Sequence, residues 1–222
     1  MGRFKNILFL IATILSACNK EETAPAKSFF YEYYPLQKAK VLIYDVDSTA
    51  YSDFTNTSTN YKFKLKDSVA DVFKDLLGND VYRVERYKKM NGSNTWVYQK
   101  TIARSLSIRA AQETLDNVTY TRLIFPPIVG AKWNGNSRNT LGEAIYEITD
   151  FPATTSIGNS QYDSTVVVLQ ADENNLIRED IASEVYAKNI GLIKKQVRAI
   201  DKDINTQKIK NGTIYSMTLQ NP

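Results

Sequence analysis

The chain lacks histidine altogether and has a single cysteine, Cys18, among its 222 residues. Without histidine, a Ser-His-Asp or Cys-His relay and a histidine-ligated zinc or iron site are excluded. One cysteine also excludes a disulfide bond within the chain. The sequence therefore predicts no catalytic residue, no metal site and no cofactor. The enzyme class left open is a hydrolase that works with carboxylates alone.

Long hydrophobic runs are also missing. The longest apolar stretch, residues 7–15, has nine residues, whereas a membrane-spanning helix needs about 20. Arg3 and Lys5 precede this stretch, so residues 1–17 are predicted to form a signal peptide and not a membrane anchor.

Small residues lead directly into the cysteine, in the order Leu15-Ser16-Ala17-Cys18. This order resembles the lipobox of bacterial lipoproteins. The resemblance implies that Cys18 is acylated, with palmitate among its acyl chains, and becomes the N-terminus of the mature protein. Several acyl chains anchor a protein stably to a membrane. An ordinary signal peptide followed by a chance cysteine is the alternative.

Residues 19–28 are polar and contain no bulky apolar side chain, so 18–28 is predicted to be a lipidated cysteine with a flexible tether. Fully extended, such a tether reaches about 33 Å. Lys20, Glu21 and Glu22 resemble the export signal of Bacteroidota lipoproteins. The resemblance implies a lipid-anchored outer-membrane protein that faces the cell exterior; an ordinary charged tether is the alternative.

Positively and negatively charged residues are nearly equal in number. The formal net charge is +4, and loss of Arg3 and Lys5 with the signal peptide lowers it by two. Such a balance gives no reason to expect nucleic acid as a partner. The expected partners are a membrane, contacted through the acyl chains, and an envelope protein or glycan.

The mature chain reads as strands and turns. Residues 61–66 alternate strictly, with Tyr61, Phe63 and Leu65 on one face and lysines on the other, which is the period of a half-buried strand. Other strands are predicted where β-branched and aromatic residues gather, at 41–46, 81–87, 96–102, 119–125, 144–148, 165–169, 185–193 and 213–219. Asn-Gly pairs at 91–92, 134–135 and 211–212 favour tight hairpin turns. The predicted fold is mostly β: one domain, residues 29–222, in which an antiparallel meander forms a curved or barrel-like sheet.

Two segments also fit short helices. Residues 68–77 combine a capping serine with helical spacing of apolar residues, and Gly78 follows. The strands on both sides nevertheless favour a hairpin that turns at 78–80. Residues 109–115 are a second helical candidate. At most one or two short helices are therefore expected.

Two further stretches, residues 125–136 and 184–194, are similar to parts of Bacteroidota surface lipoproteins, which offer no assigned catalytic residues to transfer. The first stretch contains Trp133, directly before an Asn-Gly pair. Trp133 is a candidate aromatic contact for a sugar or peptide. The alternative is that its ring packs at the end of a hairpin.

Three Asp-Ser pairs resemble the acceptor sequence of Bacteroidota O-glycosylation, which implies candidate sites at Ser48, Ser68 and Ser164. Ser164 is favoured, because residues 158–161 read as a loop just before it and a glycan must stay solvated. The alternative is turn chemistry, in which Asp and Ser side chains satisfy nearby backbone groups.

These features predict a lipid-anchored, non-enzymatic binding or assembly module of the cell envelope. A lipid- or small-ligand-binding barrel is the alternative, because a curved antiparallel sheet can enclose a cavity. A carboxylate-dependent hydrolase acting on glycans is the third. A carrier should contain a sizeable cavity, whereas a filled core favours the interaction module. The side chains expected to line such a cavity include Phe63, Leu65, Tyr215 and Met217.

Overall fold

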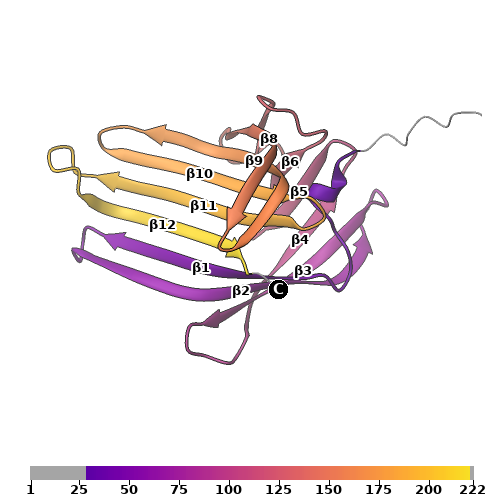
Figure 1. Ribbon diagram of the computed structural model, residues 1–222, viewed down its shortest axis with the longest axis horizontal. Helices are drawn as coiled ribbons and strands as arrows, with labels where there is room; N and C mark the ends of the chain where they lie inside the picture. The colour runs from indigo at the N-terminus through magenta and orange to yellow at the C-terminus, as the bar shows by residue number, and fades with distance from the viewer. Residues whose placement is uncertain (1–28, 221–222) are drawn as a thin grey trace, which may run out of the picture.

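Twelve strands and one short helical turn make up the computed structural model, which describes residues 29–220 (Figure 1). The helical turn is the 3-10 helix η2 (Tyr31–Tyr33). The strands are β1 (Val41–Ser52), β2 (Thr57–Lys74), β3 (Asp80–Met90), β4 (Val97–Leu106), β5 (Ala110–Leu115), β6 (Val118–Ile124), β7 (Lys132–Asn134), β8 (Ile145–Ile157), β9 (Ser160–Asn174), β10 (Arg178–Ala187), β11 (Gly191–Lys202) and β12 (Ile209–Leu219).

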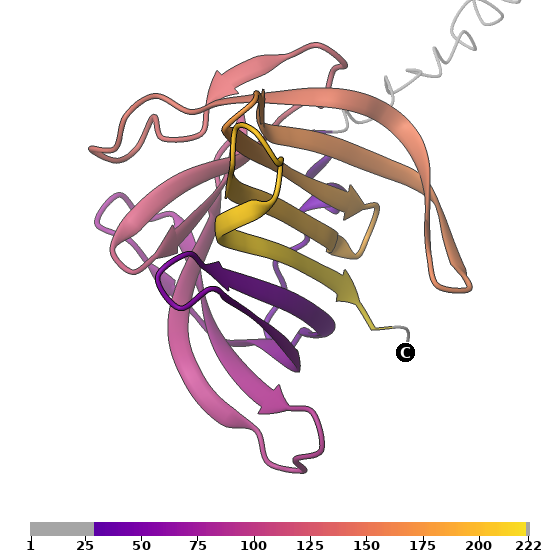
Figure 2. The same ribbon diagram turned by 90° about the vertical axis from the view of Figure 1, so that its left-hand side faces the viewer.

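All strands belong to one antiparallel sheet in the order β6-β5-β4-β3-β2-β1-β12-β11-β10-β9-β8-β7. Adjacent strands of the sheet are neighbours in sequence except at the centre, where β1 pairs with β12. The first and last strands thus lie side by side, and the chain runs outward from them in two meanders. Figure 2 shows that the sheet curves strongly, so that its two halves face each other.

The two edges of the sheet, β6 and β7, meet and nearly close it. The Thr121 amide donates to the Gly135 carbonyl oxygen at 2.8 Å, and the Trp133 indole Nε1 donates to the Thr121 carbonyl oxygen at 2.9 Å. The Asn139 side-chain amide reaches the Thr119 carbonyl oxygen at 2.8 Å. These bonds satisfy backbone groups that an open sheet edge would leave unpaired. The predicted curved, barrel-like antiparallel sheet is therefore confirmed.

The hairpin interpretation of residues 68–77 is confirmed. β2 continues to Lys74, the chain turns at Gly78 with a positive φ of 82°, and β3 begins at Asp80. Val69 lies opposite Val84 in this pair, and burial of both side chains decides between strand and helix. The helical candidate at 109–115 is wrong, because these residues form β5 between β4 and β6.

Two predicted boundaries also need correction. Residues 185–193 are not one strand: β10 ends at Ala187, and Asn189 adopts a positive φ of 64° in the turn that leads to β11. Asparagine tolerates this left-handed region better than other non-glycine residues. Asn211-Gly212 is not a turn but lies inside β12, where a Cβ on Gly212 would sit 2.1 Å from the Ala199 carbonyl oxygen.

No helix between residues 29 and 220 is long and apolar enough to cross a membrane. The buried apolar side chains form three clusters. One contains Tyr33, Tyr34 and Tyr186, the second surrounds Tyr44 and Met217, and the third joins Val69, Val84 and Ile102.

Candidate functional site

The interior of the curved sheet contains buried ion pairs that begin at Asp67 on β2. The carboxylate of Asp67 is 2% exposed and accepts two hydrogen bonds from Arg86, each 2.7 Å long. Arg104 on β4 donates to the same carboxylate at 2.8 Å. Bidentate pairs of this kind are among the strongest hydrogen bonds in proteins. Asp67 therefore joins three strands on the inner face.

The pairs continue across the interior. Arg104 also contacts Glu113 on β5 at 2.8 Å, and Glu113 accepts from Arg122 on β6 at 3.1 Å. Arg122 lies 3.9 Å from Glu184 on β10, and Lys195 on β11 contacts Glu184 at 2.6 Å. We call this set the interior ion network; its members are Asp67, Arg86, Arg104, Glu113, Arg122, Glu184 and Lys195. It connects the two facing halves of the sheet.

The network keeps its carboxylates ionised despite their burial. Burial by itself raises the pKa of Asp67, but Arg86 and Arg104 outweigh it and hold that pKa below the usual value. Burial also raises the pKa of Glu184, but Lys195 and Arg122 outweigh it and hold that pKa below the usual value. All three carboxylates of the network are saturated with cationic partners, so the network acts as a structural element.

The first described residues of the chain fill the space beside this network. We call Phe29–Leu36 the plug. Tyr33 is 3% exposed and its hydroxyl lies 2.6 Å from the Ser164 hydroxyl, while the Tyr34 ring packs against Tyr186 with 5.8 Å between centroids. The Asn189 amide donates to the Glu32 carbonyl oxygen at 2.6 Å and ties the plug to the β10–β11 turn.

The plug leaves little room inside the sheet. The cavity between the plug and the network is about 40 Å³, enough for a few water molecules at most. The four side chains expected to line a carrier's cavity pack instead into the second core cluster: Phe63, Leu65, Tyr215 and Met217. In the described part of the chain, the interior is filled.

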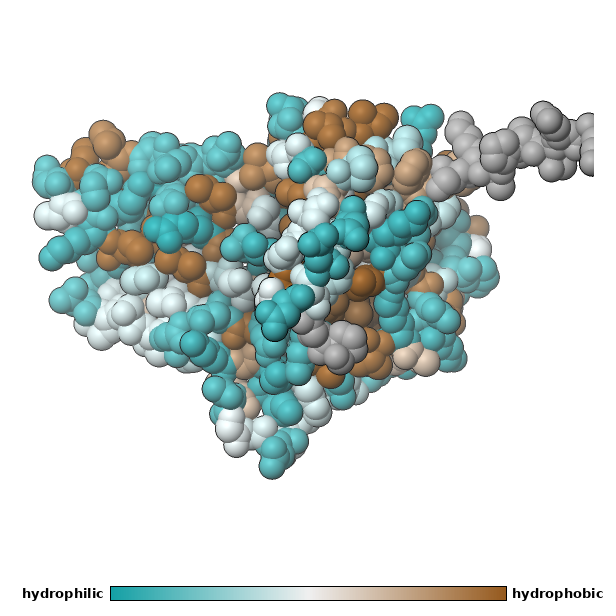
Figure 3. All heavy atoms as spheres, in the orientation of Figure 1, coloured by the Kyte–Doolittle hydropathy of each residue, from teal (hydrophilic) through white to brown (hydrophobic). Residues whose placement is uncertain are grey.

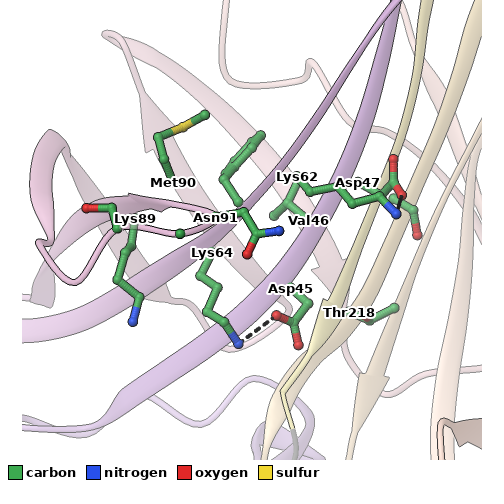
Figure 4. A pocket seen from close by; sticks show the side chains of 13 residues that line it. Asp45, Val46, Asp47, Lys62, Lys64, Lys89, Met90, Asn91 and Thr218 are labelled. Carbon is green, nitrogen blue, oxygen red and sulfur yellow. Dashed lines mark ion pairs between the residues drawn. The ribbon is translucent and has the colours of Figure 1, made fainter.

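A larger depression lies on the outer face of the sheet. This outer groove has a volume of about 360 Å³ and crosses β12, β1 and β2 beneath the β3–β4 hairpin (Figure 4). Lys64 contacts Asp45 at 2.9 Å, and Lys62 lies 3.5 Å from Asp47. Lys89 approaches from the hairpin side. The remaining polar lining consists of Asn91, Ser93, Ser216 and Thr218.

Aromatic side chains and lysines meet at one border of the groove. The ammonium groups of Lys66 and Lys89 each lie 5.1 Å from the centre of the Trp96 ring. Lys66 also lies 4.4 Å from the Tyr87 ring, and Tyr98 packs edge-on against Tyr87. These distances are typical of cation–π contacts. The border of the groove is thus both cationic and aromatic.

Sequence-predicted site residues fall into two groups. Cys18, Lys20, Glu21 and Glu22 lie outside the described residues. Trp133 lies on β7, where its half-buried ring packs edge-on against Tyr146 and its indole bonds to the backbone of Thr121. That placement corresponds to the packing alternative.

The three candidate glycosylation serines all lie in strands. Ser48 is in β1 and Ser68 in β2, both half-buried. Ser164 is in β9, beyond a turn that comprises only residues 158 and 159, and its hydroxyl contacts Tyr33. The expectation of an exposed loop at Ser164 is therefore corrected. The modification itself stays a prediction.

No protein family and no curated protein matches the chain. A solved structure that it resembles is the crystal structure of an exported protein with a YmcC-like fold from Bacteroides fragilis. The similarity covers 87% of this chain and 98% of that chain, with 12% sequence identity and a TM-score of 0.43. That neighbour is an exported protein of a Bacteroidota species, and at so low a TM-score the similarity supports no conclusion about function.

Proposed function

We propose that the protein is a non-enzymatic binding or assembly module of the cell envelope, held on the outer membrane by acyl chains on Cys18. The observation that carries this proposal is a set of exposed apolar residues at the end of the sheet where the described chain begins. The filled interior supports it as well, because a binding role then belongs to the outer surface.

The topology determines which turns share that end. In an antiparallel meander every second connection lies at the same end of the strands. The plug enters β1 at the end that also contains the β2–β3, β4–β5, β6–β7, β8–β9 and β10–β11 connections. We call this end of the sheet the tether end. Figure 1 draws the β2–β3 turn and the start of the described chain on the right, and the β1–β2, β9–β10 and β11–β12 turns on the left.

Large apolar side chains at the tether end are open to solvent. Leu77 in the β2–β3 turn is 87% exposed and Ile108 in the β4–β5 turn is 72% exposed. Leu76 in the same β2–β3 turn is exposed as well, and so are Ile128 and Val129 in the β6–β7 connection. Figure 3 shows hydrophilic residues over much of the visible face, with apolar residues in several separate patches. Exposed apolar residues gathered in one region mark an interaction site.

A membrane surface is the partner that fits the tether end. The chain before Phe29 leads back through a tether of about 33 Å to the proposed acyl chains, so this end can reach the lipid. Apolar residues on turns insert into the interfacial region and gain free energy from burial. The opposite end has exposed apolar residues as well, Phe54, Leu176, Ile177 and Ile204, but the described chain begins at the tether end and not there. Lys20, Glu21 and Glu22 support an outward-facing orientation.

Replacing Cys18 with serine is expected to abolish labelling with radioactive palmitate, because serine lacks the thiol that accepts the lipid. The variant should also leave the outer-membrane fraction, since the acyl chains supply the anchoring free energy. Metabolic labelling and membrane fractionation measure both effects.

The wild-type protein in the same host is the control, and protease added to intact cells should digest it if it faces outward. A Cys18→Ser protein that still incorporates palmitate and stays in the membrane fraction would contradict the lipoprotein proposal.

The membrane contact of the tether end is tested by a fluorescent label at Leu77. The Leu77→Cys variant of the lipidated protein offers one free thiol, because acylation blocks Cys18. A polarity-sensitive dye at this position should emit as in an apolar medium and be strongly quenched by spin-labelled lipids, since Leu77 would lie in the bilayer interface.

Phe54→Cys is the matched control, because Phe54 is also fully exposed but lies in the β1–β2 turn at the opposite end. Its dye should emit as in water and resist quenching. Equal quenching at both positions, or none at position 77, would refute the orientation proposed for the molecule.

A carrier of small ligands is the second candidate, and one observation favours it. The small interior cavity is lined by Tyr34 and Leu36 of the plug on one side and by Arg104, Arg122 and Glu184 of the network on the other. A ligand could enter that space only by displacing the plug. The stability of the plug therefore decides between the two candidates.

A further inference from the structure

We propose that the outer groove binds an acidic oligosaccharide, a chain of sugar rings that carry carboxylate groups. The proposal deepens the binding role assigned above, because it names the chemical class of the ligand and the surface that takes it. It rests on the strand register, on the charges that remain without carboxylate partners, and on the aromatic border of the groove.

The register places polar side chains in rows across the outer face. Lys194, Thr218, Asp45, Lys64 and Lys89 lie directly opposite one another on consecutive strands from β11 to β3. A second row runs parallel to it and contains Gln196, Ser216, Asp47 and Lys62. Neighbouring residues within a row are about 4.8 Å apart, which is the distance from one strand to the next. They present donors and acceptors at regular intervals, as an extended chain with many hydroxyl groups requires.

The charges of the groove are unequal in sign. Asp45 and Asp47 are matched by Lys64 and Lys62. Within residues 29–220, Lys66 and Lys89 have no carboxylate within ion-pair distance, and their ammonium groups lie over aromatic rings. The groove and its border therefore have positive charge to spare. A ligand with carboxylate groups complements this charge, whereas a neutral ligand leaves it unused.

The aromatic border suits a sugar ring. The ammonium groups of Lys66 and Lys89 are each 5.1 Å from the centre of the Trp96 ring, and Tyr98, the next aromatic side chain along the hairpin, is 51% exposed. The face of an aromatic ring packs against the apolar face of a sugar, while the polar edge of the sugar stays hydrated. A lysine beside that ring can then reach a carboxylate on the same sugar. Ring and cation together distinguish an acidic sugar from an isolated anion.

The dimensions agree with this assignment. A volume of about 360 Å³ falls within the range of roughly 300–1,000 Å³ found for small-ligand sites. The groove lies on the outer face of the sheet, where the side chains of Asp45, Asp47 and Lys62 are at least half exposed. Asp45 and Asp47 each lie within ion-pair distance of a lysine, and the groove is assigned to binding.

Binding is tested with the full lipidated chain in a neutral detergent, with an oligogalacturonate as the probe and a maltooligosaccharide of equal length as the neutral comparison. Calorimetry should detect the acidic chain and not the neutral one. The Lys66→Gln/Lys89→Gln variant should bind the acidic chain about tenfold more weakly, since two charge-assisted contacts are lost. Salt at about 1 M should weaken binding similarly, because it screens charges beyond roughly 3 Å.

Trp96→Ala should also weaken binding, and Trp96→Phe should restore most of it, which separates ring stacking from loss of folding. Lys208→Gln is the matched control, since Lys208 is an exposed lysine in the β11–β12 connection, away from the groove. Equal affinity for the neutral chain, or an equal loss in Lys208→Gln, would overturn the proposal.

A third arm replaces the sugar with phosphatidylglycerol vesicles. Stronger binding of the Cys18→Ser chain to these vesicles than to the oligogalacturonate, lost in Lys66→Gln/Lys89→Gln, would assign the groove to lipid headgroups and overturn the sugar proposal. The detergent measurement does not depend on membrane attachment. If the oligogalacturonate does not bind, the lipid-anchor proposal still stands. If Cys18 is not labelled with palmitate, the proposal for the outer groove still stands.

Discussion

Replacing Asp67 with alanine is expected to lower the free energy of unfolding by about 3–5 kcal/mol. The carboxylate is 2% exposed and accepts hydrogen bonds from both Arg86 and Arg104. Its removal leaves Arg86 buried without a partner and Arg104 with Glu113 alone. An uncompensated buried charge costs far more than the pair itself contributes. Urea unfolding followed by circular dichroism measures the loss.

Asp71→Ala is the matched control, because Asp71 is also on β2 and pairs with Lys38, but both side chains are about half exposed. Water screens such a pair, so its loss should change stability little. Losses of equal size in the two variants would mean that the interior ion network does not hold the facing halves of the sheet together.

The same network makes stability depend on acid. The pKa of Asp67 and that of Glu184 are lowered in the folded protein: burial opposes the shift, and the arginines and Lys195 outweigh it. A carboxyl group with a lowered pKa stabilises the fold above its unfolded pKa, which is about 4. That stabilisation decreases as the pH falls below about 4. In Asp67→Ala the decrease should be smaller, because one of the contributing groups is absent.

Replacing Tyr34 with alanine should cost about 3–5 kcal/mol, the usual loss for a large buried aromatic side chain. Tyr34 is 7% exposed and packs against Tyr186 beside the interior ion network. Its removal enlarges the cavity of about 40 Å³ and loosens the plug. Thermal unfolding of the variant measures the loss, and Tyr34→Phe, which keeps the ring, should lose much less.

The result also decides between the two proposed functions. A large loss shows that the plug is a part of the folded core, as the interaction module requires. A loss smaller than about 1 kcal/mol, no greater than that of an exposed side chain, would show that the plug separates from the sheet at little cost. Native mass spectrometry of the Tyr34→Ala protein from its own host should then detect a retained ligand, which would favour the carrier.

Several features of this protein follow from local sequence alone. The alternation of residues 61–66 places Phe63 and Leu65 on the inner face and the lysines on the outer face, and the structure agrees. Local period and turn residues were sufficient for most strands, because a strand's two faces meet different environments along the whole sheet. The same alternation contains one overlooked signal. Asp67 lies two residues after Leu65 and four after Phe63, so the same alternation predicts that its carboxylate lies on the inner face.

The other members of the interior ion network could not be found in this way. Arg86, Arg104, Glu113, Arg122, Glu184 and Lys195 come from six other strands, and a single sequence does not show which strands face each other across a nearly closed sheet. β bulges add to the difficulty, since each one shifts the side-chain parity of the residues that follow it. The extra residue between Val69 and Asp71 is one example.

The sequence by itself determined the strand content, the polarity of each strand face and the predicted route to the membrane, because these depend on neighbours in the chain. Only the tertiary structure decided that Tyr33 and Tyr34 fill the interior and that Lys66, Lys89 and Trp96 share one border of the outer groove. Register across strands far apart in sequence brings these groups together. Long-range pairing of that kind is specified by the packing of the whole sheet, not by any short stretch of residues.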